Sequence, residues 1–396
     1  MNRIVMKFGG SSVATTDKIK DVARLIAKKR DMGHGVVVVV SAMGKTTNGL
    51  IELANQLTAE PSPREMDLLL STGEMVSVSL LAMCLQEMGY KAMSMTGFQA
   101  GMRTSAQHMK ARIDRVEKER LENAVRNGYI VCVAGFQGMD ENGDITTLGR
   151  GGSDTSAVAL AAALDGSCEI YTDVKGIYTV DPRVRPSARK LDRLSYQETM
   201  EMANLGAKVI EPRSVELAWK YNVPLYIALN TGDVPGTRIL GEEYLVEKNT
   251  ITNISKVDGV LLVSMKGNNG NGKKVTECFL KLAQANANLD IISHSIDAQG
   301  VGITSFTGLS SDQHAIERIL EEMGMEYRFT ENVSKVSIIG NAMRNQVGVA
   351  AKAFEVFVNQ EVTFYEVSTS EISISYVVDT QDAIKIVNAL ADEFGL

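Results

Sequence analysis

The sequence has few of the residues that most often carry nucleophilic or metal chemistry. Its 396 residues include four histidines and four cysteines. The histidines are dispersed and none lies in a glycine-rich loop, which argues against a Ser/His/Asp triad or a Cys/His pair. The cysteines form no Cys-x-x-Cys motif and stand singly among apolar residues, so we expect buried free thiols at Cys84, Cys132, Cys168 and Cys278.

A large net charge and long apolar runs are absent as well. The formal net charge is −7 with 22% charged residues, a balance that does not suggest a nucleic-acid-binding surface. The longest strongly apolar stretches, residues 36–40 and 157–164, are too short to span a bilayer, and charge interrupts the first apolar run too early for a signal peptide. We therefore expect a cytoplasmic protein that binds neither nucleic acid nor a membrane.

The first part of the chain alternates strand-like and helix-period segments. This alternation predicts a mainly parallel sheet covered by helices on both faces. We expect strands at residues 4–6, 36–40, 92–95, 129–134 and 169–172, and helices at 16–30, 68–87 and 157–164. Residues 110–125 read as a charged amphipathic segment that leads into a strand.

After a turn-rich connection at residues 230–249, the chain contains one plan twice. A strand, a helix, two strands and a helix follow one another over residues 259–324 and again over 336–394. We predict three domains, at 1–240, 250–330 and 331–396, with the strand near 250–265 a candidate for sharing between the last two. Two such βαββα units suit pairing and small-ligand binding rather than catalysis.

The glycine-rich turn at residues 147–157 contains an arginine and an aspartate. Glycines let backbone N–H groups close on an anion, Arg150 adds a fixed fork for a carboxylate or phosphate, and Asp154 adds the opposite sign. The apolar run that follows predicts a helix whose N-cap is Ser153, Asp154 or Thr155. Together these features indicate a site that handles two anionic groups.

Other glycine loops follow predicted strands. Lys7 to Ser12 places an ammonium, hydroxyls and backbone N–H groups at a helix start, which fits phosphate. Gly44-Lys45-Thr46 imitates the end of a Walker A loop, but the glycine that this motif needs five positions earlier is Val39, so a P-loop ATPase is disfavoured.

Two further segments carry groups that a nucleotide or an amino acid needs. Residues 171–183 combine an aromatic ring, polar groups and an arginine, which suit a base and its phosphates. Glu74 is either an ordinary solvated helical glutamate or a partner for an ammonium group.

Six segments occur in the order seen in aspartokinases: residues 7–13, 71–74, 147–157, 171–174, 181–183 and 206–209. Residues 347–350 and 367–372 resemble the paired ACT regulatory domains of that family. The resemblance covers essentially the whole chain. It implies an α/β fold, with a three-layer α/β/α amino-acid kinase domain followed by two ferredoxin-like βαββαβ ACT domains.

The resemblance implies transfer of the ATP γ-phosphoryl group to the side-chain carboxylate of L-aspartate. The product would be 4-phospho-L-aspartate, the first intermediate toward lysine, threonine and methionine. A carboxylate is already ionised at neutral pH, so the acceptor needs no general base, and glycine loops without histidine agree with this chemistry. Mg²⁺ would arrive with ATP, since the sequence contains no visible all-protein metal cage.

The family pattern also implies roles for individual residues. Lys7 and Lys208 would contact the phosphates, and Asp154 would orient these lysines. Aspartate would be bound by Thr47, Glu74, Arg150, Gly151, Gly152 and Ser153, with Arg150 on a carboxylate and Glu74 on the α-ammonium. The nucleotide would be bound by Lys7, Phe8, Gly9, Gly10, Ser41, Thr172, Asp173, Tyr178, Arg183 and Lys208.

The ACT tail implies feedback control by lysine, threonine or both, bound between paired units. Matching positions for an effector are Asn288, Asp290, Thr369 and Ser370, and paired units predict a homodimer or homotetramer. The chain departs from the family pattern in two places. Glu211 stands where a histidine is expected, and residues 267–273 replace the usual Pro-Gly ligand loop.

Three alternatives compete with this interpretation. Another amino-acid kinase of the same fold would act on glutamate, acetylglutamate, carbamate or UMP, but residues 71–74 and the double ACT tail argue against it. A non-catalytic amino-acid sensor would have lost Lys7, Asp154 or Lys208, and all three are present. A nicotinamide dehydrogenase would need Gly-x-Gly-x-x-Gly after the first strand, which Lys7 to Ser12 lacks.

Overall fold

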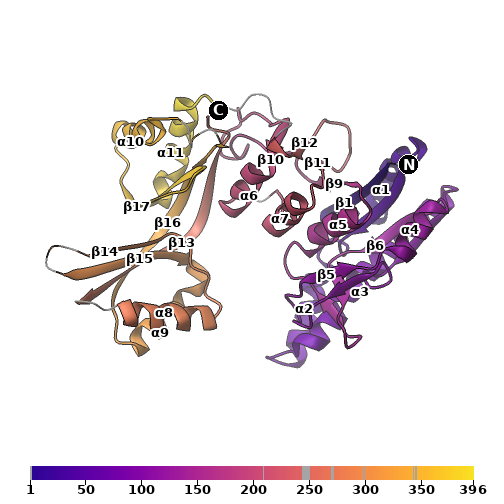
Figure 1. The fold of residues 1–396 in the computed structure, drawn as a ribbon, viewed down its shortest axis with the longest axis horizontal. Coiled ribbons are helices and arrows are strands. Elements are labelled where there is room, and N and C mark those ends of the chain that lie inside the picture. Colours follow the sequence, from indigo (N-terminus) through magenta and orange to yellow (C-terminus); the bar gives the residue numbers. More distant parts are fainter. Residues whose placement is uncertain are drawn as a thin grey trace. The chain divides into compact units, whose positions relative to one another are not determined.

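The computed structural model describes residues 2–207, 209–242, 250–268, 272–296, 298, 300–341, 343 and 346–396. The chain divides into two compact units (Figure 1). The first comprises residues 1–178 and 190–247, and the second comprises 179–189 and 248–396. The second unit therefore includes a short segment, residues 179–189, that lies within the first 240 residues of the chain. The division of residues 250–396 into two domains stays a prediction.

An eight-stranded sheet forms the centre of the first unit. Its strand order is β10-β12-β11-β9-β1-β2-β6-β3, and its pairs are parallel except for β11 with β12. The mainly parallel sheet predicted from the alternating pattern is confirmed. The strands are β1 (Arg3–Phe8), β2 (Gly35–Val40), β3 (Ala92–Met95), β6 (Ile130–Ala134), β9 (Ser167–Thr172), β10 (Arg193–Ser195), β11 (Leu225–Leu229) and β12 (Thr237–Leu240).

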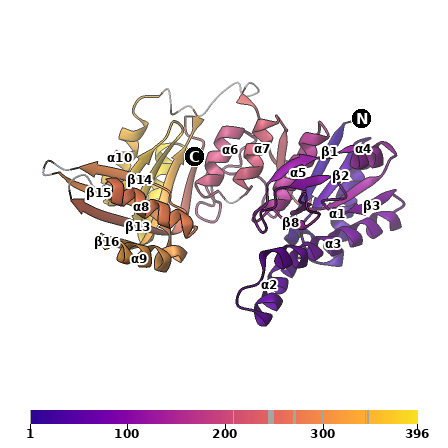
Figure 2. The same ribbon diagram turned by 60° about the horizontal axis from the view of Figure 1, so that its bottom comes forward.

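Helices cover both faces of this sheet. α1 (Thr16–Asp31) and α3 (Pro63–Glu87) contact each other and pack on the face that carries Ile4, Met6 and Phe8 (Figure 2). α5 (Gly152–Ala163) contacts β1 and β2 from the opposite face, to which the alternate residues of β1 point. Further helices are α2 (Thr46–Leu57), α4 (Glu119–Arg126), α6 (Tyr196–Asn204), α7 (Pro212–Lys220) and the short η1 (Gly10–Val13).

A second, four-stranded sheet in this unit was not predicted. Its order is β5-β4-β7-β8, with β4 (Met102–Thr104), β5 (Ile113–Val116), β7 (Gln137–Met139) and β8 (Ile145–Thr147). The prediction of one amphipathic segment over residues 110–125 is wrong, because β5 pairs with β4 and helix begins only at Glu119. Gly101 permits this pairing, since a Cβ there would lie 2.0 Å from the carbonyl oxygen of Glu117.

Helix α3 is longer and more apolar than predicted. Among the described residues it is the one helix with the length and mean hydropathy of a membrane span. Half of its most apolar 18-residue segment is buried inside the protein. Asp67 and Glu74 lie on its buried face, seven residues apart. A core helix has the same composition, and here the two buried carboxylates interrupt the apolar surface.

The second unit is built on a six-stranded antiparallel sheet of order β14-β15-β13-β16-β18-β17. The repeated strand-helix-strand-strand-helix plan is confirmed. β13 pairs first with the end of β16 and then, after a bulge near Val260, with both β15 and the start of β16. The elements are β13 (Asn253–Asn268), α8 (Gly272–Gln284), β14 (Ile292–Ile296), β15 (Val301–Leu309), η3 (Ser310–Asp312), α9 (Gln313–Glu322), β16 (Glu326–Ile339), α10 (Val349–Asn359), β17 (Phe364–Thr369), β18 (Ser373–Asp379) and α11 (Thr380–Glu393).

The unit has separate apolar cores along the sheet. One core contains residues of α10 and α11 packed on β16 and β18, and another contains residues of α8 and α9 packed on β13. Aromatic rings fill the first of these, where Phe357 and Tyr376 have ring centroids 4.5 Å apart. Each half of the repeat therefore buries its own pair of helices.

Candidate functional site

A lysine and an aspartate meet at the carboxyl end of the main sheet. Lys7 Nζ lies 2.7 Å from Oδ1 of Asp154, which belongs to the first turn of α5. Both side chains are 13% exposed, so the pair is shielded but still reachable from solvent. An ammonium group has three donors. This geometry fixes the charge of Lys7 in place while leaving donors for an anion.

Two loops that follow neighbouring strands lie against each other beside Lys7. The N–H of Gly44 donates to the carbonyl oxygen of Gly10 at 3.0 Å, and the N–H of Ser41 donates to that of Phe8 at 3.1 Å. A Cβ on Gly10 would lie 2.6 Å from the carbonyl oxygen of Ala42, so only glycine fits. On Gly9, a Cβ would lie 3.6 Å from Lys7 Nζ. The Gly9 backbone and the ammonium thus share one surface.

Glu74 is buried in the middle of α3 and is not a solvated helical glutamate. It is 3% exposed, its Oε1 accepts from the N–H of Ala42 at 3.0 Å, and its Oε2 has no hydrogen-bond partner among the described residues. Burial raises the pKa of Glu74 to about 7. A buried carboxylate with one free oxygen is suited to a cationic ligand, because such a ligand would compensate its charge.

Serine hydroxyls connect the second loop with the glycine turn. Ser41 Oγ donates to Ser153 Oγ at 3.0 Å, and Ser153 is 8% exposed. A Cβ on Gly135, at the end of β6, would lie 3.0 Å from Ser153 Oγ, so the backbone approaches this hydroxyl closely. Thr47 is half-buried in the first turn of α2.

The glycine turn adopts left-handed backbone at two positions. Gly149 has φ +77° and Gly151 has φ +65°, and α5 begins at Gly152 with Gly151 as its N-cap. The prediction that Ser153, Asp154 or Thr155 caps this helix is wrong, because the helix starts earlier at a left-handed glycine and has no side-chain cap. At the start of α5 the N–H groups of Gly152 and Asp154 donate to the carbonyl oxygens of Gly149 and Gly151, at 3.1 and 3.0 Å, so the turn itself occupies part of the helix N-terminus.

Arg150 is exposed and projects from a turn that other residues hold in place. Arg213, on α7, donates to the carbonyl oxygens of Leu148 at 3.2 Å and Ala111 at 3.1 Å. Glu211 packs against Gly151, where a Cβ would lie 2.3 Å from Glu211 Cγ. Burial, and then the charge of Asp154, raise the pKa of Glu211, while the arginines lower it. The residue that replaces the expected histidine is therefore a second carboxylate near Asp154.

The residues predicted to bind the nucleotide lie partly at the same sheet edge. Thr172 ends β9, and its hydroxyl donates to Asp173 Oδ1 at 3.1 Å. Tyr178 is half-buried, and its backbone forms an isolated antiparallel β-bridge with Lys190. Arg183 lies in the segment that belongs to the second unit and pairs with Asp181 at 2.6 Å. Lys208 lies outside the described residues.

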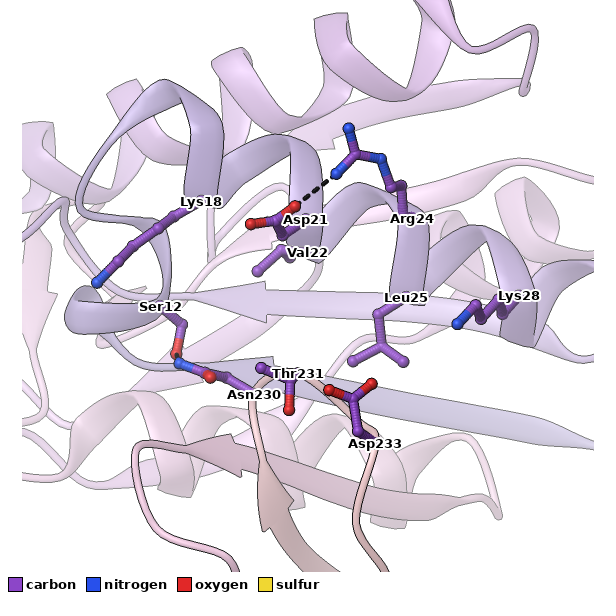
Figure 3. Close-up of a pocket in the computed structure, with 10 residues that line it drawn as sticks. All are labelled: Ser12, Lys18, Asp21, Val22, Arg24, Leu25, Lys28, Asn230, Thr231 and Asp233. Carbon is purple, nitrogen blue, oxygen red and sulfur yellow. Dashed lines mark hydrogen bonds and ion pairs between the residues drawn. The ribbon is translucent and has the colours of Figure 1, made fainter.

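A cavity of about 450 Å³ opens on the α1 side of this edge (Figure 3). Asn230 closes one wall: its Nδ2 donates to Ser12 Oγ at 3.0 Å, and its N–H donates to the carbonyl oxygen of Thr172 at 2.8 Å. Arg24 pairs with Asp21 on the opposite wall. Ser12 directly follows the Gly9-Gly10 loop and Asn230 follows β11, but the cavity contains none of the predicted site residues.

The four predicted effector positions lie in the second unit. Asp290 pairs with Lys335, a buried lysine on β16. Asn288 and Asp290 precede the edge strand β14 in the sequence, although the Asp290 side chain reaches β16 in the middle of the sheet, whereas Thr369 ends the other edge strand, β17, and Ser370 follows it. Ser370 Oγ lies 2.8 Å from Ser373 Oγ within a turn. Residues 269–271 of the unusual loop lie outside the described residues.

Sequence reasoning missed Asp67, Gln137 and Arg213, which hold the site's loops. Gln137 Nε2 donates to the carbonyl oxygen of Ser71 at 2.9 Å, which ties β7 to α3. Asp67 accepts from Thr147 Oγ1 at 2.5 Å. A signal was present: residues spaced by seven lie on one face of a helix, so Asp67 shares the face of Glu74. No group of three potential His, Cys, Asp or Glu metal ligands occurs in the part of the chain that the structure describes.

The chain matches known protein families along most of its length. The amino acid kinase family matches residues 2–229, and an ACT domain family matches residues 336–394. The chain is 47% identical to aspartokinase 2 of Bacillus subtilis strain 168 and 44% identical to the aspartokinase of Geobacillus stearothermophilus. Both alignments cover 100% of this chain and 98% of the relative.

The fold agrees with solved structures of an aspartokinase. E. coli aspartokinase III in complex with aspartate and ADP, in the R-state, superposes with a TM-score of 0.82 at 25% identity, covering 99% of this chain and 100% of that one. The same enzyme with lysine and aspartate, in the T-state, gives a TM-score of 0.80 at 25% identity and 99% coverage of both chains. The chain thus belongs to the amino acid kinase family and, within it, to the aspartokinases.

Proposed function

We propose that this protein transfers the γ-phosphoryl group of ATP to the side-chain carboxylate of L-aspartate, forming 4-phospho-L-aspartate and ADP. The observation that carries the proposal is the Lys7–Asp154 ion pair beside the Gly9 backbone, with Arg150 and the buried Glu74 on neighbouring elements. These groups supply donors for phosphates, a fork for a carboxylate and a carboxylate for an ammonium.

On the nucleotide side, Lys7 binds the phosphates together with the backbone of Phe8, Gly9 and Gly10. Asp154 holds the Lys7 ammonium in position, and Lys208 is the second catalytic lysine. Further nucleotide contacts come from Ser41, Thr172, Asp173, Tyr178 and Arg183. Mg²⁺ bound to ATP would neutralise phosphate charge, and the carboxylates of Asp154 and Asp173 would offer the oxygen donors that this ion prefers.

On the acceptor side, Arg150 binds a carboxylate of aspartate and Glu74 binds the α-ammonium. Thr47, Gly151, Gly152 and Ser153 complete the contacts. The side-chain carboxylate attacks the γ-phosphorus while ADP leaves, so one P–O bond forms and one breaks, and no proton needs to be removed. Catalysis then consists of alignment and charge neutralisation.

The second unit is the regulatory part of this proposal. Lysine, threonine or both bind there, at Asn288, Asp290, Thr369 and Ser370. By the family resemblance such effectors bind between paired ACT units, which favours a homodimer or a homotetramer built through the ACT domains. Effector binding biases the kinase between two states. The cytoplasmic location stays a prediction.

An acceptor panel tests the proposed function. ADP release is measured with L-aspartate, L-glutamate, N-acetylglutamate, carbamate and UMP, each with Mg-ATP, and then with L-aspartate plus lysine, threonine or both. We expect turnover with L-aspartate alone among the acceptors and inhibition by at least one of the two amino acids. Turnover that is independent of aspartate, or specific for another acceptor, would refute the assignment.

A further inference from the structure

Asp67 is a fully buried carboxylate outside the predicted site. Its side chain is 0% exposed and accepts from Thr147 Oγ1 at 2.5 Å, from the N–H of Met109 at 3.1 Å and from His108 Nδ1 at 2.7 Å. Three donors from two separate loops therefore converge on one carboxylate. A buried carboxylate without hydrogen-bond donors is costly in free energy. Conformations of the two loops that keep these donors on Asp67 are therefore strongly favoured.

The two loops are also joined directly. The N–H of Ala111 donates to the carbonyl oxygen of Thr147 at 2.9 Å. Met109 has φ +64°, a strained conformation for a residue with a side chain, and its carbonyl oxygen would lie 3.1 Å from a Cβ on Gly149. Strained backbone of this kind persists only where surrounding contacts impose it. Asp67 is the group that binds Met109 on one side and Thr147 on the other.

Arg150 stands three residues after Thr147, on the exposed side of the same turn. The backbone of an exposed arginine sets the point from which its flexible side chain starts, and so the region that the guanidinium can reach. Arg213 fixes the turn from α7 through Leu148, and Asp67 fixes it from α3 through Thr147. The region that Arg150 can reach thus depends on both anchors.

We infer that Asp67 and His108 form a positioning pair that sets the affinity for the acceptor amino acid by fixing the turn that carries Arg150. The inference rests on the proposed function, since it concerns the carboxylate that Arg150 binds. His108 is 20% exposed and its Nδ1 donates to Asp67. It thus supplies the third hydrogen-bond donor of the buried carboxylate, from the side nearest to solvent. Asp67 and His108 act through Arg150 and not on the reacting atoms.

Variants of His108 test the pair with little risk to folding. His108→Leu removes the donor and should raise the KM for L-aspartate by about 10- to 100-fold. A small misplacement of Arg150 would weaken its contact with the substrate by about that factor. The KM for ATP should stay within about twofold. His108→Asn keeps an N–H donor near Nδ1 and should restore most of the affinity. Glu122→Gln, which disturbs the Arg3 ion pair on α4, is the control and should leave both KM values unchanged.

Hydrogen exchange provides a readout that does not depend on activity. In His108→Leu and Asp67→Asn, amides of residues 105–112 and 147–151 should exchange faster than in the wild type, whereas those of 41–48 should not. Equal exchange, or equal rises in the KM for aspartate and for ATP, would overturn the inference. Absence of aspartate-dependent turnover in the wild type would refute the proposed function instead, and the exchange rates would still decide whether the pair fixes the turn.

Discussion

The Nζ of Lys7 and the Oδ1 of Asp154 lie 2.7 Å apart, joining the end of β1 to the first turn of α5. Because both side chains are largely shielded, this contact is screened less by salt than a surface ion pair. It places a fixed positive charge where the backbone of Gly9 and the N-terminus of α5 already favour anions. The pair therefore has the position that the proposed phosphate-binding role of Lys7 requires.

Asp154→Asn should reduce kcat by about 100-fold or more, because one preorganised electrostatic contact in an active site contributes on that order. Lys7 would lose its orienting partner while the fold keeps its shape. Steady-state rates of ADP release check this. Asp165→Asn is the matched control, since Asp165 lies just beyond the other end of the same helix and is 84% exposed. Equal activity of Asp154→Asn and the wild type would contradict the role of the pair.

Arg150→Ala should raise the KM for L-aspartate by at least about tenfold, since a charge-assisted fork to a carboxylate is lost. Its thermal stability should not change, because Arg150 is exposed. Arg150→Lys keeps the charge but not the fork and should recover only part of the affinity. Arg126→Ala, an exposed arginine on α4, serves as the control. A wild-type KM and kcat in Arg150→Ala would exclude Arg150 from the acceptor site.

The raised pKa of Glu74 predicts an unusual dependence of stability on pH. With a pKa of about 7 in the folded protein against an ordinary 4.5, the folded state keeps this proton where the unfolded chain has lost it. The free energy of unfolding should therefore fall as the pH rises from about 4.5 to about 7, by up to about 3 kcal/mol, and then level off. Glu74→Gln should remove this component.

Denaturant unfolding of the wild type and of Glu74→Gln across this pH range checks the slope. Glu87→Gln, an exposed substitution at the end of the same helix, is the control. In the proposed role of Glu74 it is the ionised form that binds the substrate ammonium, so the KM for aspartate should also fall as the pH rises through about 7 in the wild type but not in Glu74→Gln. If the difference in the free energy of unfolding between the wild type and Glu74→Gln does not change with pH over this range, the pKa of Glu74 is not raised.

Gly151→Ala should cost activity because a Cβ would overlap Glu211 and the φ of +65° disfavours a side chain. Gly143→Ala is a matched control: its φ is +85°, but nothing lies within 4 Å of the added Cβ. We expect about 1–2 kcal/mol of destabilisation from φ strain in both and a loss of aspartate turnover in Gly151→Ala alone. Adding Glu211→Gly, which removes both the Cγ and the Cβ of residue 211 (2.5 Å from the added Cβ), should relieve the overlap. Similar activity in the two alanine variants would contradict the close packing.

Much of the fold follows from local pattern. The run Val36 to Val40 predicts a strand buried on both faces, and β2 is buried along its whole length. The four-stranded sheet escaped prediction because three of its strands, such as Gln137–Met139, are only three residues long, too short for a period of two to be recognised. Its pairing depends instead on close approaches such as that at Gly101.

The residue types of the site could be predicted from the sequence, but the contacts that hold its loops in place could not. Lys7 and Asp154 carry opposite charges in glycine-rich segments, and the structure brings them together. Burial of Glu74 and the left-handed cap at Gly151 depend on contacts with residues distant in the sequence, so no local pattern reveals them. The same holds for Arg213, whose two backbone acceptors come from different loops.

Identifying the product tests the central claim most directly. Wild-type protein is incubated with Mg-ATP and L-aspartate in the presence of hydroxylamine, which converts an acyl phosphate into a hydroxamate. We expect aspartate β-hydroxamate in an amount equal to the ADP released, with none formed when aspartate is omitted. ADP release without the β-hydroxamate, or a hydroxamate formed only with another acceptor, would contradict phosphoryl transfer to the side-chain carboxylate of aspartate.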